Sequence, residues 1–104
     1  MQQEFKVNEI ADDAFYERAD AHIHLSNDQL NQVTRGKVSA SMLYGTARFN
    51  AWVSACGFAS GQGMAEARNG TIDYFVAEYR KMLEDNLDDY IANFDKYMAV
   101  NSTL

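Results

Sequence analysis

The chain has 104 residues and a mass of 11.7 kDa, which leaves room for one domain and excludes a second of ordinary size. Apolar residues make up 47% of it, so it can bury enough surface to fold, and its single cysteine excludes an internal disulfide. The net charge is −6, and an acidic chain without a basic stripe is a poor candidate for binding nucleic acid or anionic lipid.

Helices are predicted throughout, because the chain has no proline and its apolar residues do not alternate as in strands. We expect an all-α fold, a three-helix bundle whose long third helix is either continuous or kinked. A break near Asp85 and Asn86 would make four helices. The expected boundaries are a flexible N-terminal segment at residues 1–11, a helical domain at 12–98 and a C-terminal tail at 99–104.

The first predicted helix covers residues 12–34. Apolar residues recur on one side of it at helical spacing, and carboxylates occupy the opposite side. His22 falls on the apolar side, where we expect a neutral core histidine with a satisfied hydrogen bond. Gly36 follows and is expected to end the helix in the left-handed conformation.

The polar side of this helix suggests a metal site. His24 lies there with Glu17 and Asp20, a set that predicts either a weak divalent-cation site or a solvated acidic face. His22 and His24 cannot bind one ion together, because residues two apart lie about 200° apart around a helix. One hypothesis is therefore a metal-dependent enzyme whose metal is held by Glu17, Asp20 and His24.

The second predicted helix runs from Ser39 to Cys56 and contains one charged residue, Arg48. Large apolar residues form one side and alanines another, which predicts a central helix covered on two sides. Arg48 therefore needs a carboxylate or water, since an unpaired buried guanidinium is costly. A small anionic ligand held by Arg48 with His22 and Tyr44 is the alternative to an ion pair.

The third predicted helix spans residues 62–98, after a glycine-rich loop in which Gly57 is expected to end the second helix. At 1.5 Å per residue it would be about 55 Å long, whereas a compact domain of this size spans about 34 Å. Either the helix bends, or the end of its apolar stripe covers a second subunit, or the N-terminal Phe5, Val7 and Ile10 lie over that stripe. The residues expected at that interface are Tyr90, Ile91, Phe94 and Tyr97.

Four carboxylates lie close together in this helix, at Glu84, Asp85, Asp88 and Asp89. They lack the order of ligands that a calcium-binding loop requires. We expect a solvated face, or else a docking site for a basic partner protein.

Three stretches carry a resemblance to known proteins: FYERADAHIHLSN (15–27), RGKVSASMLYGTARFNAWVSA (35–55) and YFVAEYRKMLEDNLDDYIANF (74–94). Through them the chain is similar, over residues 13–98, to a small proteobacterial family of unknown function. The resemblance implies a bacterial, cytoplasmic protein. Because that family has no assigned activity, the resemblance implies no catalytic residue or cofactor.

The expected function follows from what each feature allows. Every polar cluster has a structural interpretation, and the low-charge stretch at 38–65 is too polar to be a membrane span. We therefore expect a non-catalytic helical interaction or scaffold protein that forms a homodimer, with no cofactor and no nucleic-acid or membrane partner. The alternatives are a bundle that binds a small anionic ligand and the metal-dependent enzyme.

Overall fold

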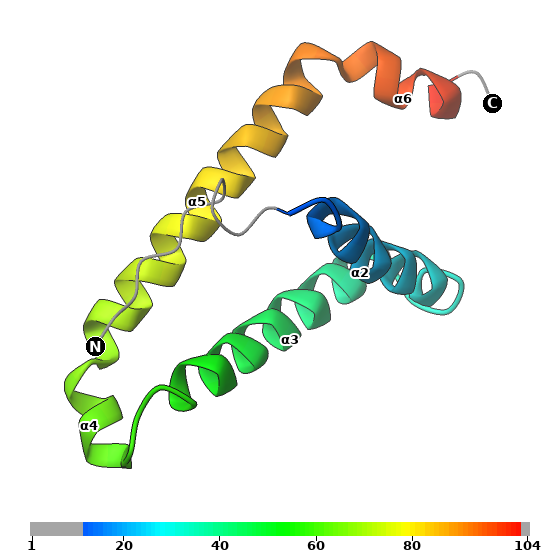
Figure 1. Cartoon of the computed structure of the whole chain (residues 1–104). Coiled ribbons are helices and arrows are strands. Elements are labelled where there is room, and N and C mark those ends of the chain that lie inside the picture. The colour runs from blue at the N-terminus through cyan, green and yellow to red at the C-terminus, as the bar shows by residue number, and fades with distance from the viewer. Residues whose placement is uncertain (1–11, 103–104) are drawn as a thin grey trace. The chain divides into compact units, whose positions relative to one another are not determined.

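The computed structural model describes residues 12–102. Within this range the chain forms helices and no strand, so the all-α prediction is confirmed. The helices, three of them long, are α2 (Phe15–Gln29), α3 (Arg35–Ala55), α4 (Gly61–Glu66), α5 (Arg68–Ala92) and α6 (Phe94–Ser102) (Figure 1). The expected N-terminal segment at 1–11 lies outside the described residues, as do residues 103–104 of the expected tail.

The chain divides into two compact units, and the boundary in the sequence falls between residues 66 and 67. Unit 1 contains α2, α3 and α4, and unit 2 contains α5 and α6. The long stripe expected on one helix is therefore divided between two units, with most of it in unit 2.

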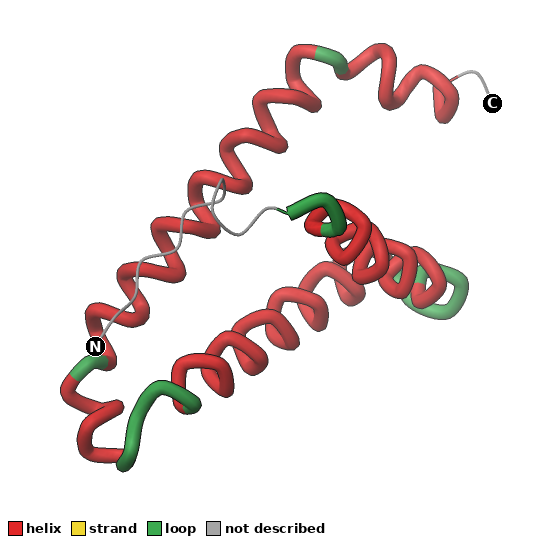
Figure 2. Tube along the Cα trace, viewed as in Figure 1, coloured by secondary structure: helices red, strands yellow, loops and turns green. Residues whose placement is uncertain are grey.

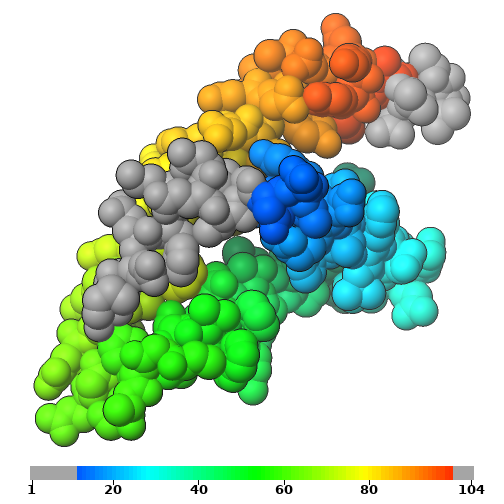
Figure 3. All heavy atoms as spheres, viewed as in Figure 1, coloured from blue at the N-terminus to red at the C-terminus, as the bar shows by residue number. Residues whose placement is uncertain are grey.

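Unit 1 is organised around the contact between α2 and α3. Figure 3 shows atoms of α2 packed against those at the beginning of α3. The hydroxyl of Ser26 on α2 donates a hydrogen bond to the sulfur of Met42 on α3, over 3.2 Å. Val38, on the first turn of α3, is 5% exposed and is the one buried residue of the described chain. Helix pairing in unit 1 thus depends on very little buried apolar surface.

The ends of α2 and α3 differ from the prediction. Helix α2 ends at Gln29 rather than continuing to residue 34, and α3 begins four residues before Ser39. The physical reason is Thr34, whose extended backbone (φ −71°, ψ 157°) opens α3, while its carbonyl accepts hydrogen bonds from the amides of Lys37 and Val38. Gly36 therefore lies inside a helix. No glycine in the described chain has a positive φ, so neither it nor Gly57 is a left-handed terminator.

The predicted third helix is interrupted twice, at Ala67 and at Asn93, giving α4, α5 and α6. Figure 2 shows the second interruption as a short loop between α5 and α6. Helix α5 passes through Asp85 and Asn86 without a break. The side-chain amide of Asn86 donates to the carbonyl of Met82 over 2.8 Å, so this asparagine bonds back to its own helix instead of capping a new one.

Candidate interaction surface

Unit 2 has a bend between α5 and α6 that is held by one carboxylate. At the bend, Asn93 has a backbone conformation outside the helical range (φ −119°, ψ 29°). Its side-chain Nδ2 donates to the carbonyl of Asp89 over 3.1 Å and to Asp89 Oδ1 over 2.9 Å. The hydroxyl of Tyr97, on α6, donates to Asp89 Oδ2 over 2.9 Å. Asp89 thus ties the end of α5 to α6, and we call Asp89, Asn93 and Tyr97 the elbow cluster.

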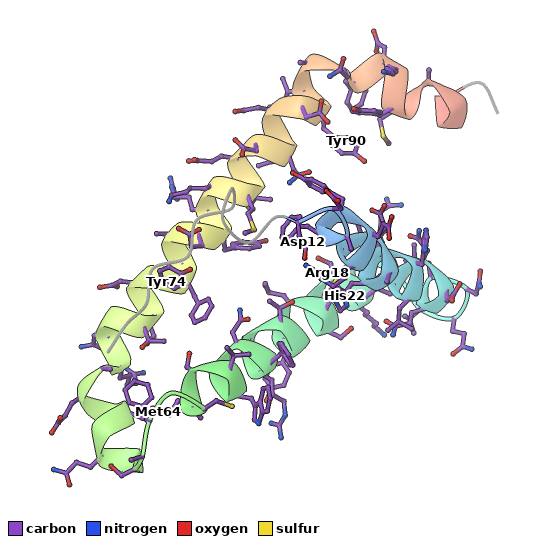
Figure 4. The ribbon with its side chains drawn as sticks, viewed as in Figure 1. Asp12, Arg18, His22, Met64, Tyr74 and Tyr90 are labelled. Atoms are coloured by element: carbon purple, nitrogen blue, oxygen red, sulfur yellow. The ribbon has the colours of Figure 1, made fainter. Side chains whose placement is uncertain are left out.

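An aromatic surface lies on the same bend. The rings of Tyr90 and Tyr97 are in contact, with centroids 4.8 Å apart and planes inclined by 46°, and Lys96 Nζ is 5.8 Å from the centre of the Tyr97 ring. Figure 4 shows Tyr90 close to the end of α5. We define the aromatic patch by the four residues that the sequence selected as an interface. Their exposed fractions are 50% for Tyr90, 73% for Ile91, 58% for Phe94 and 39% for Tyr97.

The elbow cluster changes the acidity of Tyr97. The hydrogen bond to Asp89 raises the pKa of Tyr97 above its ordinary value of 10.0, and the negative charge of Asp89 raises it further. A raised pKa means that the neutral hydroxyl is favoured by the folded state. The elbow should therefore be stable below pH 10 and lose this contribution as the pH rises through the raised pKa of Tyr97.

This prediction can be checked by following the tyrosine ring carbons by NMR during an alkaline titration. In Asp89→Ala, which removes both the acceptor and the charge, the pKa of Tyr97 should fall toward its ordinary value. Asp88→Ala is the matched control, because it deletes the neighbouring carboxylate with the same change in net charge. An equal fall of the Tyr97 pKa in the control would contradict the assignment.

The residues proposed for an anionic ligand lie on the surface of unit 1. His22 is exposed on α2 (Figure 4), so the prediction of a core histidine is wrong. Arg48 and Tyr44 are exposed on α3, Tyr44 at 67%, and no hydrogen bond joins any two of the three in the described chain. Helix α3 is therefore not covered on two sides as expected. The hydrogen bond from α2 reaches Met42, in the first half of α3, and water can solvate the exposed guanidinium of Arg48.

The residues proposed for a metal are also exposed. Glu17, Asp20 and His24 lie on α2, and no three His, Cys, Asp or Glu side chains in residues 12–102 form a group that could hold a metal ion. Beside them, Arg18 pairs with Asp12 over 3.2 Å (Figure 4). The structure therefore does not bring this set together as a ligand group.

The four carboxylates Glu84, Asp85, Asp88 and Asp89, which we call the acidic cluster, differ in the partners that they contact. Glu84 Oε2 pairs with Arg80 Nε over 3.2 Å, one turn earlier on α5, and all four carboxylates are exposed. Asp89 is exposed, as expected of a solvated face, and it also holds the elbow. The sequence contained a signal for this role, because Asp89, Asn93 and Tyr97 are spaced by four residues and so share one side of a helix.

Comparison with known proteins gives the family. The model of a family described as "Protein of unknown function (DUF3144)" matches residues 15–91. The chain belongs to this family. It is also similar to the NMR structure of the protein NB7890A from Shewanella sp., with 38% identity, a TM-score of 0.72, and coverage of 86% of this chain and 95% of that one. No curated protein matches the chain. The resemblance to a bacterial family of unknown function is thereby confirmed.

The match to DUF3144 begins at the first residue of α2 and ends at Ile91, one residue before the end of α5. Helix α6 lies beyond it, so the aromatic patch crosses the boundary of the family model. No helix in the part of the chain that the structure describes has both the length and the apolar character of a membrane span.

Proposed function

We propose that this DUF3144 protein is a non-catalytic interaction protein of the bacterial cytoplasm that self-associates through the aromatic patch. The observation that carries the proposal is the exposure of four large apolar side chains on one bend, from 39% at Tyr97 to 73% at Ile91. Exposed apolar surface is typical of protein interaction sites, where tyrosine and phenylalanine are enriched.

The fixed conformation of Tyr97 in the aromatic patch also supports the proposal. Tyr97 is held by Asp89 and by the ring of Tyr90, so its side chain loses little conformational freedom on binding. A patch that meets the same patch of a second copy forms an isologous, two-fold interface, the commonest arrangement in oligomers. A cytoplasmic location agrees with the exposed free thiol of Cys56, since that compartment keeps thiols reduced.

The alternatives have weaker support. Small-molecule sites are concave and enclose most of the ligand, whereas His22, Tyr44 and Arg48 are all exposed. A metal enzyme needs ligands that converge, and Glu17, Asp20 and His24 form no such group. A basic partner protein at Asp85 and Asp88 remains compatible with the exposure of both carboxylates, but nothing else on α5 favours it over self-association.

Sedimentation equilibrium of the full chain tests the proposal. As the protein concentration rises from micromolar to millimolar, the apparent mass should increase from the monomer mass of 11.7 kDa toward twice that value. The fit gives the dissociation constant that serves as the reference for the variants below. A mass that stays at that of the monomer over the whole range would contradict self-association.

A further inference from the structure

A second apolar feature of unit 2 runs along α5. Its residues follow each other at intervals of three or four and fall within an arc of about 80° around the helix. We call them the α5 stripe, and each is between 41% and 60% exposed: Ile72, Val76, Tyr79, Leu83, Leu87 and Tyr90. At 1.5 Å per residue the stripe is about 27 Å long. Such spacing is typical of helices that pack lengthwise against another helix.

The α5 stripe adjoins the aromatic patch. Tyr90 belongs to both, because it is the last residue of the stripe and its ring contacts that of Tyr97 on α6. Leu87 lies one turn before Tyr90, and residues three or four apart are neighbours on a helix surface. Helix α5 has no break along the stripe. The two features therefore share a residue and lie end to end in unit 2.

The aromatic patch alone offers too little apolar area for a stable interface. If its four side chains expose on the order of 100 Å² each, two copies that meet through it bury roughly 800 Å² in total, which is the size of a crystal contact. The other five residues of the α5 stripe, each about half exposed, add on the order of 80 Å² each. Patch and stripe together then bury roughly 1,600 Å² between two copies, the size of a standard stable interface.

The charges nearest to the α5 stripe are paired, although the chain as a whole is acidic. Between residues 79 and 90, the charged residues closest to the centre line of the stripe are Arg80 and Glu84, which pair over 3.2 Å. Asp85 and Asp88 lie about 140° or more from that line, on the far side of the helix. A two-fold interface brings the same surface of both copies together. An acidic chain therefore meets its own copy with least repulsion on a face such as this one.

We propose that a second copy of the chain packs lengthwise on the α5 stripe, so that the dimer interface continues from the aromatic patch along α5 as far as Ile72. The inference rests on the proposed self-association and adds the surface that the aromatic patch lacks. A second copy is favoured over a charged partner protein, because the stripe is apolar and the charges beside it are already paired.

A substitution at the end of the stripe that lies far from the aromatic patch tests the inference. Val76 lies about 21 Å before Tyr90 along α5, at 1.5 Å per residue. In Val76→Lys, sedimentation equilibrium of the full chain should give a dissociation constant about 100-fold above that of the unsubstituted chain, tenfold for each of the two copies. The substitution reduces the net negative charge of −6 by one, so a weaker dimer cannot result from greater repulsion between the copies.

Ala77→Lys is the matched control. It adds the same charge at the next residue, which is exposed and lies about 120° from the centre of the stripe. Its dissociation constant should stay within about threefold of the reference, and the helical circular dichroism of both variants should equal that of the unsubstituted chain. An unchanged dissociation constant in Val76→Lys, or an equal rise in the two variants, would overturn the inference. If Phe94→Glu still gave a monomer, the proposed function would stand without it.

Isotope-filtered NOE spectra of a mixture of labelled and unlabelled chain test the same surface without a substitution. Contacts between copies should appear at the methyl groups of Val76, Leu83 and Leu87 as well as at the aromatic patch. Contacts confined to the aromatic patch would overturn the inference and leave the proposed function intact. Contacts of these methyl groups with residues 1–11 of the same chain would also overturn it, because the chain would then cover its own stripe. A monomer mass with no contact between copies would overturn both.

Discussion

Val38→Asp is expected to lower the free energy of unfolding of unit 1 by about 3–5 kcal/mol, because it places an unpaired carboxylate in a buried position. Val38 is 5% exposed and lies on the first turn of α3, the helix that contacts α2 in unit 1. Folded domains are stabilised by only about 5–15 kcal/mol in total. The substitution should therefore unfold unit 1 under conditions in which the unsubstituted chain is folded.

Urea unfolding followed by the fluorescence of Trp52 measures this effect, since Trp52 is the only tryptophan of the chain and lies on α3. The matched control is Val33→Asp, which introduces the same carboxylate at a valine that is 43% exposed. Its effect should stay within about 0.5 kcal/mol, as for most surface substitutions. Equal destabilisation by the two variants would show that the burial of Val38 does not stabilise unit 1.

Phe94→Glu is expected to raise the dissociation constant of the dimer about 1000-fold. Truncating a central interface residue costs about 2 kcal/mol or more, and a two-fold dimer contains the substitution twice, so the loss is about 4 kcal/mol. Phe94 is 58% exposed and is the first residue of α6, where an acidic side chain is favourable for the helix. The monomer should keep its helical content.

Sedimentation velocity at a concentration where the unsubstituted chain is dimeric should therefore show Phe94→Glu as a monomer. Ala92→Glu adds the same charge two residues earlier, on the side of α5 opposite Tyr90, and should change the dissociation constant less than about tenfold. If Ala92→Glu weakened the dimer as much as Phe94→Glu, net charge rather than the aromatic patch would control association.

The helical class and the long segments could be predicted from the sequence, because apolar spacing and the absence of proline report directly on local backbone preference. The residues at which the helices begin and end could not be predicted in this way. Gly36 and Gly57 have the composition of helix terminators, but the boundary between α2 and α3 is decided by the extended backbone of Thr34. Likewise Asn86 is as good a cap by composition as Asn93, and only Asn93 lies at a break.

The candidate site was predictable to a similar degree. Periodicity selected the four residues of the aromatic patch as an expected interface, although it could not decide whether another element covers them. The same ambiguity made the prediction for His22 wrong: a residue on an apolar arc is buried only if something packs against that arc, and His22 is exposed. Asp89 was missed because a carboxylate among carboxylates indicates a solvated face, whereas its partners lie four and eight residues further along the chain.

Burial of a single residue, Val38, in the described chain has a consequence for how the protein is regulated in a cell. If the chain self-associates as proposed, part of the free energy that keeps it folded comes from assembly, and that contribution depends on protomer concentration. A scarce chain is then open to proteases, while an abundant one is protected by its own copies. The level of synthesis would thus act as a control on lifetime, without any ligand or modifying enzyme.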